Sequence, residues 1–187
     1  MRRGFKTWSE EQALAFRVAL NLRPDSPLPA ERLAEYLGVH LITPSEVPGM
    51  SEELLDALLT NDTCGWSAVT VQVGDLAIVV SNVSHSLPRR ESDLMHELAH
   101  IICRHPAMRI VRVAGLPVRE YSDVQEEEAA WLGGCLHLPR VALWNALSRG
   151  LTVPAIMARF NASEQMVRYR RNVTGIDVQL GRSRPSF

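Results

Sequence analysis

Cysteine and lysine are scarce in this chain, and the few cysteines form no recognisable pattern. The three cysteines, Cys64, Cys103 and Cys135, are far apart, and Lys6 is the only lysine. An odd number of separated cysteines without a C-x-x-C pair excludes a disulfide framework and a cysteine zinc knuckle. We therefore expect reduced thiols and a cytoplasmic protein.

Long apolar runs, a signal peptide and a strong net charge are also lacking. No run approaches the roughly 20 apolar residues of a membrane span, and no apolar segment follows the basic first residues. The net charge of -1 gives no general case for binding nucleic acid or a membrane surface. Since 46% of the 187 residues are hydrophobic and 22% charged, we expect one globular domain over 1–187, of unspecified oligomeric state.

Hydrophobic periodicity predicts short helices around one hairpin, an α+β pattern. Residues 8–60 should hold N-terminal helices, 66–139 the hairpin and a metal-site core, and 153–173 a helix pair with helix-turn-helix spacing. The expected elements are a helix from a capping box at Ser9 to about Pro24, a helix over 29–37, a strand over 39–42, a helix over 51–59, a hairpin over 66–80, a helix from after Pro88 to about His105, a loop or second irregular strand pair over 108–121, a helix from Ser122 or Asp123 to about Pro139, two helices within 153–171 and a loose tail from Gly181.

The sequence His96-Glu97-Leu98-Ala99-His100 is an H-E-x-x-H motif, and apolar spacing around it predicts a helix. Residues four apart on a helix return almost to the same direction, so both imidazoles should project from one face toward a single metal. Glu97 is offset by about 100°, which makes it a poor ligand but places it beside a water on that metal. Zinc lowers the pKa of such a water toward about 7 and polarises a carbonyl, so Glu97 can act as general base.

A catalytic zinc needs a third protein ligand and an open fourth position. The predicted helix that follows the irregular stretch offers three successive candidates, Glu126, Glu127 and Glu128. Residue spacing alone does not choose among them.

These residues resemble the ImmA/IrrE family of zinc metallopeptidases. There an H-E-L-G/A-H motif is followed by a helix of pattern E-x-E-A-N-x-F-A-x-x-L-L-M-P, and the matching run here is Glu126 to Pro139. The resemblance implies that Glu126 is the third ligand, beside His96 and His100. Ala130, Gly133 and His137 replace the family's usual Asn, Ala and Leu, and Glu91-Ser92-Asp93 replaces Arg-Phe-Thr, which indicates a divergent member.

Membership implies a compact, zincin-like α+β domain, with the active-site helix packed on a small sheet and followed by C-terminal helices. It also implies a zinc endopeptidase that cleaves one protein partner, typically a helix-turn-helix repressor or antitoxin. Neither spacing nor composition identifies that partner.

Other residues give alternative interpretations. His105 is out of register for a metzincin ligand, so we interpret it as a helix-end residue whose positive form would suit the helix dipole. Tyr121 and His137 are candidates for stabilising an oxyanion, but we interpret them first as a packed aromatic residue and a partly buried histidine. The helix pair carries Arg168, Arg170 and Arg171, so a DNA-binding or partner-binding regulator with a structural or weakly active zinc site is the alternative function; DNA is a possible but not favoured partner. The intact Glu97 argues against a degenerate enzyme. A protein that no longer catalyses hydrolysis would be expected to lose its general base before its metal ligands, because the base serves only the reaction.

Overall fold

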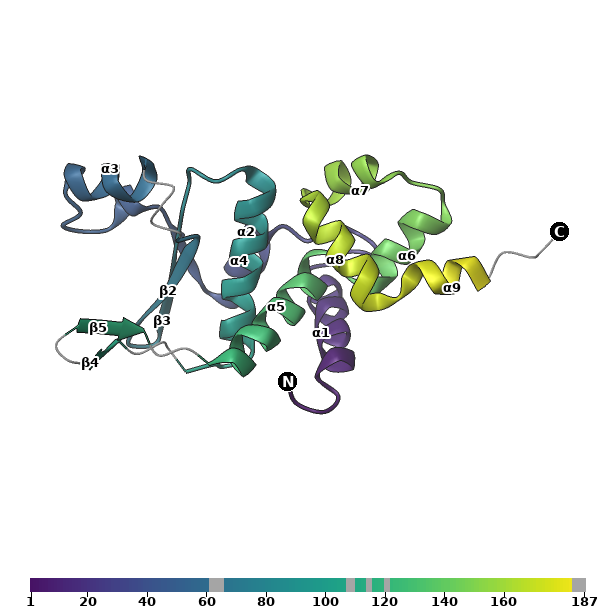
Figure 1. The fold of residues 1–187 in the computed structure, drawn as a ribbon, viewed down its shortest axis with the longest axis horizontal. Helices are drawn as coiled ribbons and strands as arrows, with labels where there is room; N and C mark the ends of the chain where they lie inside the picture. The colour runs from purple at the N-terminus through teal and green to yellow at the C-terminus, as the bar shows by residue number, and fades with distance from the viewer. Residues whose placement is uncertain (61–65, 107–109, 114–115, 120–121, 183–187) are drawn as a thin grey trace.

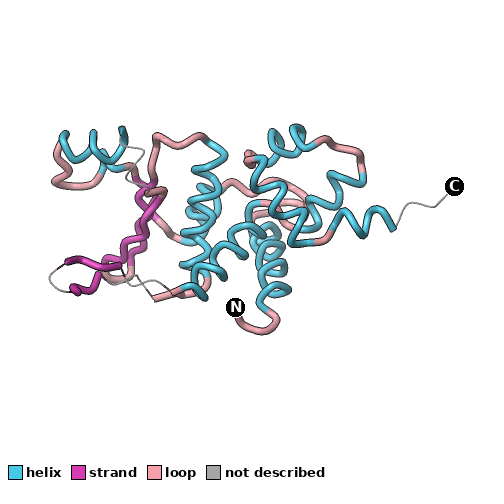
Figure 2. Tube along the Cα trace, viewed as in Figure 1, coloured by secondary structure: helices cyan, strands magenta, loops and turns pink. Residues whose placement is uncertain are grey.

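The computed structural model describes residues 1–60, 66–106, 110–113, 116–119 and 122–182. Its architecture is α+β, as the sequence predicted, with the strands gathered at one end and the C-terminal helices at the other (Figures 1 and 2). In chain order the elements are α1 (Phe5–Ala19), α2 (Ala30–Leu37), β1 (His40–Ile42), the 3-10 turn η1 (Pro44–Glu46), α3 (Glu52–Thr60), β2 (Ala68–Val73), β3 (Leu76–Ser81), α4 (Leu87–Ile102), β4 (Ile110–Val113), β5 (Leu116–Arg119), α5 (Asp123–His137), α6 (Arg140–Ser148), α7 (Val153–Phe160), α8 (Glu164–Thr174) and α9 (Ile176–Arg182).

The three-stranded sheet has the order β1-β3-β2, and α4 packs on one of its faces. β4 and β5 form a separate antiparallel pair, which is the second strand pair that the sequence offered as one possibility for this stretch. β1 runs parallel to β3, while β2 and β3 form the predicted antiparallel hairpin with Val71 opposite Ile78. Gly74 occupies the left-handed region at φ 60° in the tight turn, where a side chain would be strained. Because residues alternate across a strand, Thr70 and Val79 share the face that meets α4, whereas Val69 and Val71 lie on the opposite, exposed face.

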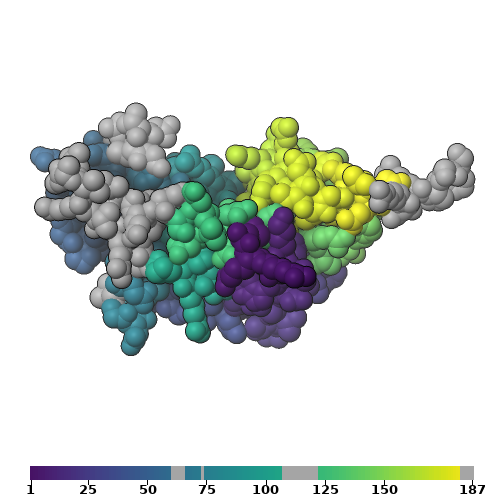
Figure 3. Space-filling model, turned by 60° about the horizontal axis from the view of Figure 1, so that its bottom comes forward, coloured from purple at the N-terminus to yellow at the C-terminus, as the bar shows by residue number. Residues whose placement is uncertain are grey.

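The N-terminal helix begins earlier than its capping signal indicated. α1 starts at Phe5, and the Ser9 hydroxyl donates to the Phe5 carbonyl at 2.8 Å from inside the helix, so Ser9 is not a cap. A serine hydroxyl can bond the preceding turn as readily as it caps one, which explains the error. α1 lies against α5, and Figure 3 shows the N-terminal segment in purple beside both the green α5 region and the yellow C-terminal helices.

Glu91, one of the residues that depart from the family pattern, caps α2. Its carboxylate accepts a hydrogen bond of 2.6 Å from the backbone N–H of Ala30, the first residue of that helix. Burial raises the pKa of Glu91 despite this hydrogen bond and another with Asn161. Pro29 offers no side-chain cap of its own, so a carboxylate from α4 supplies the partner that the helix end needs.

Helix α5 joins two hydrophobic cores. Its buried Leu132 and Leu136 belong to the core formed with α1, α2 and α4, while Leu138 at its end belongs to the core of the C-terminal helices. Two fully buried arginines hold this junction. Arg17 donates to the Leu136 carbonyl at 2.8 Å, and Arg170 donates to the Leu138 carbonyl at 2.9 Å and pairs with Glu10.

The C-terminal segment is more helical than predicted, because α6 and α9 were not anticipated. The expected pair is present: Asn161, at φ 47°, turns the chain between α7 and α8, and Thr152 and Ser163 cap the two helices. α6 follows directly on Pro139, a residue that we had interpreted only as the end of α5. Among the described helices, none combines the length and apolarity needed to cross a membrane.

Candidate metal centre

Helix α4 places the two histidines of the motif on the face that meets α5. The helix continues unbroken through His96 and His100 because its buried stripe, which includes Leu94 and Leu98, packs in the first core. The two histidines are partly exposed, with 31% and 16% of their side chains accessible, so an ion and a substrate group can reach them.

His96, His100 and Glu126 converge, and they are the group of potential metal ligands found among the described residues. The Nε2 atoms of His96 and His100 lie 3.1 Å apart; Glu126 lies 3.1 Å from His96 through Oε2 and 3.5 Å from His100 through Oε1. Donors bound at about 2.0–2.1 Å around a tetrahedral zinc ion are separated by about 3.3 Å from one another. The spacing of these three side chains therefore fits one tetrahedral ion.

The structure separates the three successive glutamates that the sequence left open. Glu127 is exposed and pairs with the N-terminal amine at 3.2 Å, and Glu128 is buried, where it accepts from Arg2 and lies 3.3 Å from His105. Only Glu126 faces the two motif histidines. Successive residues on a helix differ by about 100° in direction, so at most one of the three can point at the site.

Glu97 lies beside this cluster and is oriented by the sheet. The Thr70 hydroxyl, on β2, donates to Glu97 Oε2 at 2.5 Å. This contact ties the carboxylate of Glu97, the residue after His96 on α4, to the hairpin that packs on that helix.

The electrostatic surroundings favour a neutral imidazole at His100. Burial, reinforced by the nearby His96, lowers the pKa of His100 to about 4. A histidine must be neutral to donate a lone pair to a metal. At neutral pH a proton therefore does not compete with an ion for His100.

Gly133 brings α5 close to α4 at the first motif histidine. A Cβ at this position would lie 3.1 Å from the Met95 carbonyl oxygen and 3.2 Å from the backbone N and Cα of His96. These neighbours are backbone atoms, which cannot swing aside as a side chain would. The glycine that replaces the family's usual alanine thus allows an unusually close approach of the two helices that carry the site.

His105 lies at the end of α4, as we interpreted it, and His137 is a buried histidine rather than an oxyanion stabiliser. Only 7% of the His105 side chain is exposed, and its ring contacts His100 and Glu128. His137 is buried in the C-terminal core, bonded at 3.0 Å to the Phe160 carbonyl, and burial lowers its pKa. It lies 11 residues beyond Glu126 on α5, about 16 Å along the helix axis, too far to stabilise an oxyanion at the site. Tyr121 lies outside the described residues.

The arginines of the helix-turn-helix-like pair are mostly engaged within the protein. Arg170 is fully buried against Leu138 and Glu10, and Arg171 pairs with Asp177 at 3.0 Å. Arg168 is the exposed member of the three. Three arginines in sequence therefore do not make a row of three phosphate contacts, which weakens the DNA-binding alternative.

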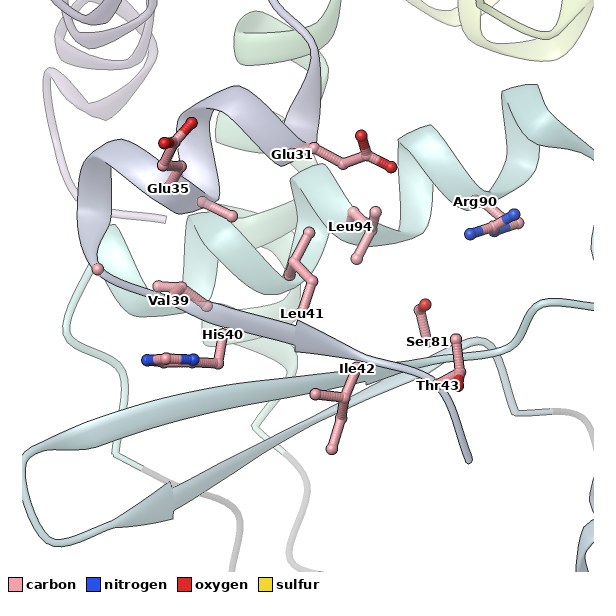
Figure 4. A pocket seen from close by; sticks show the side chains of 12 residues that line it. Glu31, Glu35, Val39, His40, Leu41, Ile42, Thr43, Ser81, Arg90 and Leu94 are labelled. Atoms are coloured by element: carbon pink, nitrogen blue, oxygen red, sulfur yellow. The ribbon is translucent and has the colours of Figure 1, made fainter. Parts of the chain in front are cut away.

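A separate hollow lies beside the first half of α4. Its volume is about 550 Å³, and Figure 4 shows Leu41 and Leu94 in its middle, with Glu31 and Arg90 on the helices above and Ser81 and Thr43 near the strands. None of His96, His100 and Glu126 lines the hollow, although Leu94 precedes His96 by only two residues. The hollow is therefore distinct from the metal-ligand cluster.

Comparison with known proteins agrees with the geometry. The family model Peptidase_M78, described as the IrrE N-terminal-like domain, matches residues 34–172, which include the H-E-x-x-H helix, the hairpin, α5 and the C-terminal pair. Neither the curated proteins nor the solved structures that were compared gave a match. The matched residues span most of the chain, and with the convergence of its motif histidines on Glu126 they establish that it belongs to the ImmA/IrrE family of metallopeptidases.

Proposed function

We propose that the chain is a zinc-dependent endopeptidase, in which His96, His100 and Glu126 hold the ion and Glu97 is the general base. The observation that carries the proposal is the convergence of three donor side chains at separations of 3.1 to 3.5 Å, on two helices that pack together. Two imidazoles and a carboxylate are a ligand set used by catalytic zinc in peptidases.

The chemistry divides between the ion and the chain. Zinc, when bound, polarises the scissile carbonyl and makes water more acidic. Glu97 then takes a proton from the attacking water onto its carboxylate and later delivers it to the leaving nitrogen. Thr70 holds that carboxylate in place through its 2.5 Å hydrogen bond, so that little reorganisation is needed when the proton moves.

Metal analysis of the purified, untagged protein tests the ligand set. We expect about one zinc ion per chain in the wild type, lost in His100→Ala and in Glu126→Ala, because a catalytic site has only three protein ligands. Glu127→Ala is the matched control: it removes a neighbouring, exposed carboxylate and should leave the zinc content unchanged. Loss of zinc in Glu127→Ala but not in Glu126→Ala would overturn the assignment, and a wild type that binds no zinc would overturn the zinc proposal itself.

We further propose that the substrate is a helix-turn-helix repressor or antitoxin, as is typical of the family. The proposal rests on membership of the family, and α7 and α8 offer no rival row of DNA contacts, because Arg170 pairs with Glu10 and Arg171 with Asp177.

The substrate is tested with a helix-turn-helix protein encoded next to the gene of this chain. Incubation of the two proteins should yield one discrete cleavage, visible by mass spectrometry and absent with Glu97→Gln. Unfolded casein serves as the control for unspecific proteolysis. Cleavage of casein as fast as the repressor would contradict a dedicated substrate.

A further inference from the structure

The end of α4 folds His105 back onto the helix that carries His100. Arg104 adopts a left-handed conformation at φ 53° directly after the C-cap Cys103. The N–H of His105 then bonds the His100 carbonyl at 3.0 Å, and the N–H of Arg104 bonds the Ile101 carbonyl at 3.0 Å. This is the pair of hydrogen bonds of a Schellman motif, which stops a helix and reverses the chain over its last turn.

The same reversal brings the two imidazole rings together. Nδ1 of His105 lies 3.0 Å from Nδ1 of His100, with the rings in an edge-to-face arrangement and their centroids 5.0 Å apart. On its other side, His105 Nε2 lies 3.3 Å from Glu128 Oε2. The His105 and Glu128 side chains are buried, at 7% and 4% exposure, so water does not replace these contacts readily.

The chemistry of imidazole sets the direction of each hydrogen bond. A neutral histidine carries one N–H and one lone pair, and a His100 that offers its Nε2 lone pair to a metal must carry its proton on Nδ1. That N–H donates to Nδ1 of His105, whose own proton must then be on Nε2 and donate to Glu128. In this series of hydrogen bonds each N–H has one acceptor. The protons all point from the metal side toward the carboxylate: His100 donates to His105, and His105 donates to Glu128.

Glu128 is itself fixed in place. Its Oε1 accepts from both the backbone N–H and the Nε of Arg2, at 3.0 Å each, while its Oε2 faces His105. Glu128 therefore contacts His105 from a fixed position, a role that the exposed Glu127 does not have.

We propose that His105 and Glu128 are positioning residues that hold His100 in the tautomer and ring orientation that present its Nε2 to the metal. The proposal rests on the proposed metal site. Hydrogen-bond partners behind a metal-bound histidine commonly change metal affinity by about 10- to 100-fold when they are removed.

His105→Phe tests the proposal because phenylalanine keeps a ring of similar size but offers no acceptor to His100. In metal-free protein, the nitrogen NMR shifts of His100 should report an Nδ1-protonated ring in the wild type and a shift toward the Nε2-protonated tautomer in His105→Phe. Zinc affinity, measured by competition with a fluorescent chelator, should fall about 10- to 100-fold in His105→Phe. Glu128→Gln, whose amide oxygen still accepts from His105, should give a smaller fall.

His85→Phe is the matched control. His85 is also a buried histidine, at 8% side-chain exposure, and it lies 3.2 Å from a carboxylate, Asp93 on α4, but it does not contact the metal cluster. Both variants should lose a similar amount of thermal stability in the metal-free state, and only His105→Phe should change zinc affinity and the His100 tautomer.

Three results would overturn the proposal. The first is equal zinc affinity in His105→Phe and the wild type. The second is equal losses of affinity in His105→Phe and His85→Phe, which would mean a general effect of stability. The third is a loss in His105→Phe as complete as in His100→Ala, which would make His105 a ligand. A wild type that binds no zinc would instead remove the proposed function, and this inference with it.

Discussion

Replacement of Glu97 by glutamine should reduce the rate of peptide hydrolysis by about 100- to 10,000-fold, the range that a general base usually contributes. The amide cannot accept the proton of the attacking water, yet it has nearly the same shape and can still accept the 2.5 Å hydrogen bond from Thr70. Zinc content and binding of the uncleaved substrate should therefore be unchanged. Single-turnover cleavage, zinc analysis and a binding titration, made on the same preparation, separate these quantities.

Thr70→Val provides the accompanying test of the Glu97 assignment. It removes the hydroxyl that orients the carboxylate but keeps a β-branched side chain on β2, so we expect a partial loss of activity with the base still present. Full activity in Glu97→Gln would exclude Glu97 as the base. A wild type that binds its partner without cleaving it would instead favour a binding module with a structural metal.

Replacement of Arg170 by alanine should lower the free energy of unfolding by about 2–5 kcal/mol, because it truncates a fully buried side chain and removes its ion pair with Glu10. The change removes the ion pair with Glu10, which keeps only its hydrogen bonds from the Arg140 N–H and the Cys135 thiol among those described, and it leaves the Leu138 carbonyl without its 2.9 Å donor. Urea unfolding followed by circular dichroism measures the loss. Arg168→Ala is the matched control on the same helix: its side chain is exposed, and its effect should stay within about 0.5 kcal/mol.

Equal effects of Arg168→Ala and Arg170→Ala on stability would contradict the burial of Arg170. Such a result would also return Arg170 to the set of residues available for contact with DNA phosphates.

The sequence was informative where function imposes a short, periodic pattern. The H-E-x-x-H spacing on a helix predicted that His96 and His100 share a face, and they do so because an α-helix repeats every 3.6 residues. The hairpin was predicted equally well, since alternation over β2 and a glycine turn are local signals.

The rest of the site depends on contacts between residues that are distant in sequence. Nothing near Glu128 indicates that it meets His105 and Arg2, because that contact needs α5 packed on α4 and the N-terminal segment laid over both. The position of His105 follows from a left-handed Arg104, a conformation that an arginine rarely adopts and that no sequence rule assigns to it. The role of Gly133 could not be predicted for the same reason. Only the packing of α5 on α4 shows that a side chain at this position would press on the backbone of Met95 and His96.

The junction that α5 makes between the two cores has a consequence for protein turnover. Glu126 stands in the first turn of α5, while the other end of that helix supports the C-terminal core. An ion that binds only the folded chain shifts the unfolding equilibrium by mass action, by about 4 kcal/mol when its concentration is about 1,000 times Kd. Because residues of α5 and its C-cap belong to both cores, unfolding of either core would disturb the helix that carries Glu126. A cell short of the ion would then hold less of the protein, as unfolded chains are removed by quality-control proteases. Metal supply would then regulate the abundance of the peptidase as well as its activity.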